Sequence, residues 1–195
     1  FTPGTRIATT EGPTDVESLR QGDHVLTRDN GPQEIEWIGT RRMTGARFHV
    51  APDLRPIRIG AGALGIERPD QELLVSPGHR MLVRGAAARA LFNETEVLVA
   101  ARDLVNGSTI TVDSALREVT YVHLMLPSHQ IIWANGVETE SFHPASADLG
   151  LMDEVDRIRL FAYRPEIEGD PYRYGAYARR NLTTPESAIL RHQAA

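Results

Sequence analysis

The sequence contains no cysteine. Disulfide bonds and thiolate metal sites are therefore excluded within the 195 residues, and cysteine usage says nothing about the redox compartment. The thiolate, the most nucleophilic group that proteins use against a carbonyl carbon, is missing as well. A reaction that needs a thiol must take it from outside these residues.

Long apolar runs and an excess of positive charge are also missing. No run approaches the ~18 apolar residues that span a bilayer, so we expect no membrane span. The first residues lack the basic and apolar regions of a secretory signal, so we expect any export signal to lie elsewhere. A formal net charge of -5 and a pI near 5.8 disfavour a surface for polyanions, so nucleic acid is not expected as a partner.

The residues that are present suit a mostly β domain. A hydrophobic content of 41% over 195 residues can form the core of one domain, with or without an appendage. Short runs between glycines and prolines carry the β-branched residues typical of strands, at residues 6–9, 24–27, 34–38, 72–75 and 118–122. Asn30 and Gly31 favour a tight turn, which predicts a hairpin over residues 24–38. Helical signals before residue 150 allow about one turn each at residues 15–19 and 101–104.

Residues 16–25 are echoed by residues 101–110. Leucine, glycine and an apolar strand residue hold the same relative places in both segments, and an apolar strand follows each. Two copies of one β-unit, packed face to face, would share a core and leave a cleft along their pseudo-two-fold axis. The alternative is that Leu-x-x-Gly is only a common turn signature.

Four blocks carry a resemblance to a known family. They read Phe-Thr-Pro-Gly-Thr at residues 1–5, Val-Glu-Ser-Leu-Arg-Gln-Gly-Asp at 16–23, Val-Ser-Pro-Gly-His at 75–79 and His-Gln-Ile-Ile-Trp-Ala-Asn-Gly at 129–136. In order and spacing they resemble the Hint superfamily of hedgehog autoprocessing domains and inteins, above all its bacterial branch. The resemblance covers residues 1–144 and implies an all-β, horseshoe-shaped fold with pseudo-two-fold symmetry. Residues 145–195 would then form a partly helical C-terminal extension.

The resemblance implies self-cleavage at a cysteine directly before Phe1. In such a reaction the thiol attacks the carbonyl carbon before it, and an N-to-S acyl shift turns the peptide bond into a thioester. The departing nitrogen needs a general acid, and imidazole suits that role near neutrality. His79 matches the histidine of the family's Thr-x-x-His block, which contacts the scissile amide, and Ser76 matches the hydroxyl that orients it. The alternative for His79 is a turn residue at the start of a strand.

Other histidines are open to more than one interpretation. His129 resembles a histidine of the late block that inteins use in their C-terminal steps, and it is our third candidate catalytic residue; a surface histidine that caps a strand would explain it as well. His123 alternates with Tyr121 and Met125 on one strand face, which favours a structural role. A zinc hydrolase is a rival function that would draw its ligands from His79, His123, His129 and His143. None of these has a tight ligand spacing, so we expect neither a metal nor a cofactor.

Two departures from the family narrow the reaction. Protein splicing needs a His-Asn pair at its C-terminal junction, and residues 136–144 contain none; Asn135 belongs to the turn of the late block. Hedgehog-type sterol transfer resembles N-terminal cleavage with an added acid that activates the sterol, and residues 37–42 carry no acid. What remains is cleavage of the flanking N-terminal polypeptide, with the thioester taken by water, a thiol or an amine.

The missing cysteine leaves three explanations. It precedes Phe1 in a longer chain, it has been substituted to trap a precursor, or the chain is an inactive relative that acts as a non-catalytic β binding module. The acyl shift keeps the cysteine on the Hint fragment, so cleavage itself does not explain a start at Phe1. Residues 1–195 alone are expected to be inactive, because they contain no cysteine.

Residues 145–195 differ in character from the rest. Tyrosine and arginine interleave over residues 172–180, as in some single-strand binders, but the acids nearby favour amphipathic side chains that lie over the β-core. Thr184 and Pro185 predict a helix start, as its cap and first residue. Hint domains of this type look like appendages of exported bacterial proteins, which favours a location outside the cell.

Overall fold

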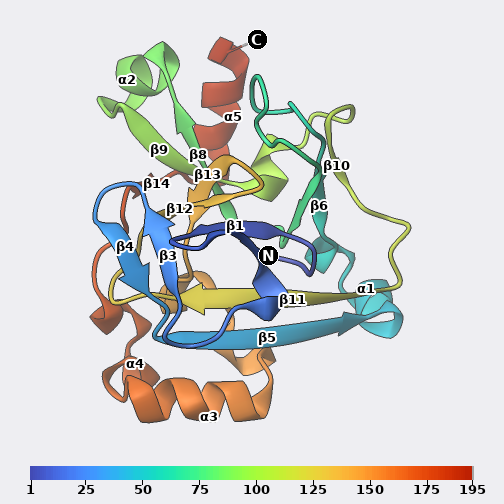
Figure 1. Ribbon diagram of the computed structural model, residues 1–195. Coiled ribbons are helices and arrows are strands. Elements are labelled where there is room, and N and C mark those ends of the chain that lie inside the picture. Colours follow the sequence, from blue (N-terminus) through green and yellow to red (C-terminus); the bar gives the residue numbers. More distant parts are fainter. Residues whose placement is uncertain (195) are drawn as a thin grey trace.

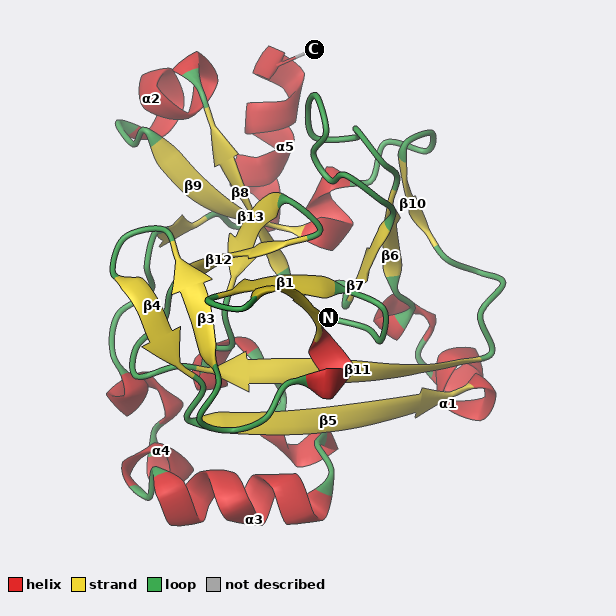
Figure 2. Ribbon diagram, viewed as in Figure 1, coloured by secondary structure: helices red, strands yellow, loops and turns green. Residues whose placement is uncertain are grey.

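The computed structural model describes residues 1–194 of the chain (Figures 1 and 2). The strands are β1 Arg6–Thr9, β2 Gly12–Asp15, β3 His24–Thr27, β4 Gly31–Glu34, β5 Trp37–Thr44, β6 Ile57–Ile59, β7 Leu73–Val75, β8 Arg80–Arg84, β9 Glu96–Ala100, β10 Ile110–Val112, β11 Glu118–Met125, β12 Ile131–Ala134, β13 Val137–Glu140 and β14 Arg180–Asn181. The α-helices are α1 Gly45–Val50, α2 Ala86–Phe92, α3 Glu154–Tyr163, α4 Glu166–Gly169 and α5 Thr184–Ala194. Short 3₁₀ turns are η1 Val16–Ser18, η2 Pro52–Leu54, η3 Ala101–Leu104, η4 Pro144–Ser146, η5 Leu149–Leu151 and η6 Pro171–Tyr174. Within the described residues, no helix has the length and apolar character needed to cross a membrane.

The strands form three sheets. The largest has nine strands in the order β14-β9-β8-β13-β12-β1-β3-β4, with β2 beside β1. A three-stranded sheet has the order β10-β6-β7, and β11 pairs with β5. In Figure 1 the β5–β11 pair runs as two long arrows that lie side by side beneath β1 and point in opposite directions, with α3 on its outer side. The predicted mostly β fold is confirmed.

The long pair relates the two halves of the domain. β11 pairs antiparallel with β5 over its whole length, from Glu118 opposite Thr44 to Met125 opposite Trp37. Each strand follows one of the echoed segments, and each segment contains the expected single turn, η1 or η3. Two equivalent strands that pair antiparallel are related by a two-fold rotation, so the topology agrees with the pseudo-symmetric horseshoe expected from the sequence.

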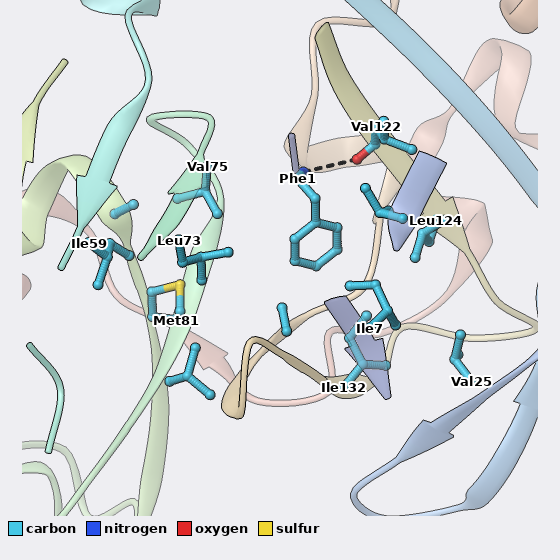
Figure 3. Packing of buried hydrophobic residues seen from close by; sticks show 14 of the residues in the cluster. Phe1, Ile7, Val25, Ile59, Leu73, Val75, Met81, Val122, Leu124 and Ile132 are labelled. Atoms are coloured by element: carbon cyan, nitrogen blue, oxygen red, sulfur yellow. Dashed lines mark hydrogen bonds between the residues drawn. The ribbon is translucent and has the colours of Figure 1, made fainter. Parts of the chain in front are cut away.

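Phe1 lies in the core where the three sheets meet. Its side chain is 3% exposed. Figure 3 shows its ring among side chains of the three-stranded sheet (Leu73, Val75), the long pair (Val122, Leu124) and the nine-stranded sheet (Ile7, Met81, Ile132). Because so much apolar surface surrounds this ring, the first residues of the chain are held firmly in place.

Some local predictions need correction. The hairpin exists, but its second strand is β4, in which Gly31 pairs with Thr27 and Glu34 with His24. Gly31 has a φ of 64°, so the strand starts at the turn itself, and the apolar run 34–38 is divided between β4 and β5. The sequence also failed to predict α1 and α2, although α2 starts on an alanine-rich run.

The extension packs against the β-core. The indole nitrogen of Trp37 donates to the carbonyl of Asp156 in α3 at 3.0 Å, and an Asp156 carboxylate oxygen accepts from the Thr40 amide at 2.7 Å. At the opposite side, β14 adds a parallel strand to β9. Helix α5 lies where it was predicted but begins one residue earlier, at Thr184 rather than Pro185, and its cap is Thr183, because the Thr183 hydroxyl and the Glu186 carboxylate accept from each other's amides.

Candidate functional site

Ser76 and His79 lie at the two ends of a tight turn between β7 and β8. The His79 amide donates to the Ser76 carbonyl at 3.0 Å. Two further bonds hold the turn to η3: the Arg102 amide donates to the Pro77 carbonyl at 3.0 Å, and the Ala101 amide to the His79 carbonyl at 2.8 Å. Backbone hydrogen bonds therefore fix the positions of Ser76 and His79, independently of the contacts of their side chains.

The hydrogen bonds of His79 define its tautomer. The Thr139 hydroxyl donates to the Arg80 carbonyl at 2.8 Å, so its oxygen is left to accept from Nε2–H of His79, 2.5 Å away. The lone pair then lies on Nδ1, for which the described residues offer no hydrogen-bond partner. Burial lowers the pKa of His79 well below its usual 6.5. His79 is thus a neutral imidazole with a free basic nitrogen at pH 7.

Phe1 continues the sheet beside β11. Its nitrogen donates to the Val122 carbonyl at 3.0 Å (Figure 3). The Val122 amide donates back to the Phe1 carbonyl at 2.8 Å. Two residues that exchange both bonds form a hydrogen-bonded antiparallel pair, so a residue before Phe1 would stand opposite His123 on the same face of the sheet. The ring of Phe1 also meets the imidazole of His79 edge to face, with 4.6 Å between centroids.

The edge of β11 that pairs with Phe1 offers few further places. The Leu124 carbonyl, the next acceptor on the same edge of β11, is occupied by the amide of Phe142 at 2.8 Å. The gap between Phe1 and Phe142 therefore leaves room for one residue against β11, the one opposite His123.

A cavity of about 280 Å³ lies between the candidate residues. Its walls include Arg41, Ser76, His79, Tyr121, His123 and Phe142. The cavity lies on the face of the β5–β11 pair toward which the side chain of a residue before Phe1 would point. The arrangement can hold a nucleophilic side chain between neutral imidazoles.

His123 lines this cavity, a position that its strand alternation did not indicate. Its ring packs on Phe142, with 5.0 Å between centroids, and it lines the cavity with His79. Burial lowers its pKa to about 3, so it is a second neutral base. Alternation placed His123 on the right face of the strand but did not reveal that this face borders a cavity.

His129 is buried behind the cavity rather than in its wall. Its Nδ1 accepts from the Ala178 amide of the extension at 3.0 Å, and its Nε2 lies 3.3 Å from a Glu140 carboxylate oxygen. The other Glu140 oxygen accepts from the Arg80 amide, next to His79, at 3.0 Å. His129 also packs edge to face on His143, with 5.3 Å between ring centroids, and both Glu140 and His143 line the cavity, so His129 contacts the site through these two residues.

Asn135 lies in the turn to which the sequence assigned it, and His143, one of the four histidines considered as zinc ligands, packs against the extension. Asn135 sits with a φ of 47° in the turn between β12 and β13, where its side-chain oxygen accepts from the Arg6 amide at 2.8 Å. His143 stacks on Tyr177 of the extension, with 4.1 Å between centroids. Among residues 1–194, no three His, Asp or Glu side chains lie close enough together to hold a metal ion.

The family model described as "Hint domain" matches residues 1–146. The chain belongs to the Hint domain family. This Hint domain is similar in structure to the MchDnaB-1 intein, at 16% identity and a TM-score of 0.45, over 72% of this chain and 98% of that one. It is also similar to a bacterial intein-like domain from Clostridium thermocellum, at 13% identity and a TM-score of 0.45, over 72% of this chain and 96% of that one. The comparison with curated proteins gives no significant match.

Proposed function

We propose that this Hint domain cleaves the peptide bond on the N-terminal side of a cysteine that directly precedes Phe1. The observation that carries the proposal is the pairing of Phe1 with Val122. It directs the preceding residue to the place opposite His123, in the cavity that also holds Ser76 and His79.

The reaction is an N-to-S acyl shift. The cysteine sulfur attacks the carbonyl carbon before it, a carbon–sulfur bond forms, and the carbon–nitrogen bond breaks. Since burial keeps His79 neutral, its Nδ1 first takes the thiol proton and then gives it to the departing nitrogen. The Ser76 hydroxyl orients the scissile amide. The thioester is then taken by water, a thiol or an amine, and His123 removes the proton of that acceptor.

His129 acts in this scheme as a positioning residue. With Glu140 it holds the amide of Arg80, and hence the start of β8 on which His79 sits. Its replacement should slow cleavage less than replacement of His79 and should not change the reaction product.

The test is a precursor that carries its native upstream residues, followed on a gel with and without added thiol. We expect cleavage just before the cysteine, acceleration by thiol and loss of cleavage in His79→Ala. His24→Ala, at an exposed position on β3, is the matched control and should cleave like the parent. A precursor that has the cysteine and stays intact would refute the proposal, and a native residue other than a nucleophile before Phe1 would support a non-catalytic module.

A further inference from the structure

Arg41 lies in the wall of the cavity, and its side chain is unusual because part of the guanidinium is buried without a hydrogen-bond partner among the described residues. In β5 it stands opposite Tyr121, and Gly39, two residues earlier, stands opposite His123. Arg41, Tyr121 and His123 therefore share the face that borders the cavity. The Tyr121 hydroxyl is already engaged, because it donates to the Leu54 carbonyl at 3.0 Å.

The guanidinium of Arg41 has no partner in the described part of the chain. Its Nε and one terminal nitrogen are buried and make no hydrogen bond there, although Arg28, Arg164 and Arg179 all bind carboxylates. Burial lowers the pKa of Arg41, which reflects the cost of an uncompensated charge. Asp148 and Asp53 also line the cavity, but Asp148 accepts from the Gly150 amide at 3.0 Å and forms no ion pair with Arg41.

A half-buried guanidinium without a partner is suited to a planar carboxylate, which it can bind through two parallel hydrogen bonds. The position of Arg41 indicates which molecule would carry that carboxylate. A residue before Phe1 lies two strands from β5, so its Cα is about 12 Å from that of Arg41 from ordinary strand spacing and rise. The arginine side chain covers part of that distance, and the rest fits a short carbon chain between carboxylate and reacting atom.

We propose that the acceptor of the thioester is a small acid that also carries a thiol or an amine, and that Arg41 binds its carboxylate. The proposal rests on the proposed function. With a thiol acid, the acceptor sulfur attacks the acyl carbon, a new carbon–sulfur bond forms, and the bond to the cysteine sulfur breaks. The acceptor proton passes through His123 to the released cysteine sulfur, so the exchange needs no other reactant.

The test compares three thiols as acceptors for the precursor: 3-mercaptopropionate, neutral 2-mercaptoethanol and cationic cysteamine. Each rate is divided by the rate of the same thiol with a free peptide thioester, which removes differences in intrinsic reactivity. We expect the normalised rate with 3-mercaptopropionate to exceed that with 2-mercaptoethanol about tenfold or more, as for one charge-assisted contact. Arg41→Gln should abolish this preference, so that the normalised rates with 3-mercaptopropionate and 2-mercaptoethanol become equal.

Arg42→Gln is the matched control. Arg42 is the next residue on β5 and pairs at the exposed surface with Glu118, so the preference should survive its replacement. Asp148→Asn should strengthen the preference, because it removes a negative charge from the cavity wall. Equal normalised rates for all three thiols, or a preference retained in Arg41→Gln, would overturn the proposal.

A binding measurement separates this proposal from the reaction itself. 3-Mercaptopropionate and the neutral 3-mercapto-1-propanol are titrated into the protein of residues 1–195, and chemical shifts near Tyr121 are followed by NMR. Binding of the acid alone, lost in Arg41→Gln, supports the site even if no precursor cleaves, in which case the proposed function fails by itself. Absence of acid binding to the parent chain overturns the site.

Discussion

Replacement of His79 by glutamine tests the proton relay most directly. The glutamine amide can still donate to the Thr139 hydroxyl, as Nε2–H of His79 does, but it cannot take up and release a proton. A positioned general acid contributes about 10²- to 10⁴-fold, so the acyl shift should slow by that factor, or about 3 to 5 kcal/mol in activation free energy. Thr139→Val leaves the imidazole in place but removes the bond that fixes its tautomer and the bond to the Arg80 carbonyl, so its loss should be about tenfold.

The assay is single-turnover cleavage of the precursor, with the thioester captured by excess thiol and the products identified by mass spectrometry. Urea unfolding of each variant separates a lost proton relay from a lost fold. Cleavage of the His79→Gln precursor at the parent's rate would refute the relay, and so would a larger loss in Thr139→Val than in His79→Gln.

Four further outcomes are expected. Because the pKa of His79 is lowered by burial, cleavage should persist as the pH falls through 6.5 and be lost only below it; an acid limb at 6.5 or higher in a pH–rate profile would contradict this. The free energy of unfolding should also decline below pH 6.5, where the unfolded chain binds a proton that buried His79 does not, as acid titration of urea midpoints can show. Asp156→Ala removes the acceptor for the Thr40 amide and hydroxyl and should lower the free energy of unfolding by about 1–3 kcal/mol in urea. Deletion of residues 147–195 uncovers Trp37 and should lower the melting temperature and raise binding of a hydrophobic dye; an unchanged melting curve would show that the β-core is stable without the extension.

The sequence indicated the candidate site best where its residues are close together along the chain. Ser76 and His79 are joined by one turn, and the block that contains them was recognisable from its residues alone. His123 and Arg41 reach the cavity only through the register of β5 and β11. Alternation gives a clear inward face when one side of a sheet meets solvent, but here both sides are covered, one by the core and the other by the cavity and the extension.

The contrast between short-range patterns and long-range packing also explains which parts of the fold were predicted. Strand runs, the echoed segments and the single turns at η1 and η3 depend on short-range patterns, and they appear where the sequence indicated. The start of β4 at Gly31 depends on which residue completes the turn, and helix α2 depends on packing against α5 that a local pattern does not contain.

The contact between Phe142 and Leu124 has a consequence for whatever polypeptide precedes the domain. Since that contact occupies the next place on β11, an upstream chain must leave the sheet at the bond that we propose is cut. If the residue opposite His123 is the proposed cysteine, it stays with the domain, and no residue upstream of it pairs with the sheet. The upstream sequence would then be free to vary, so one domain could process unrelated flanking proteins without change.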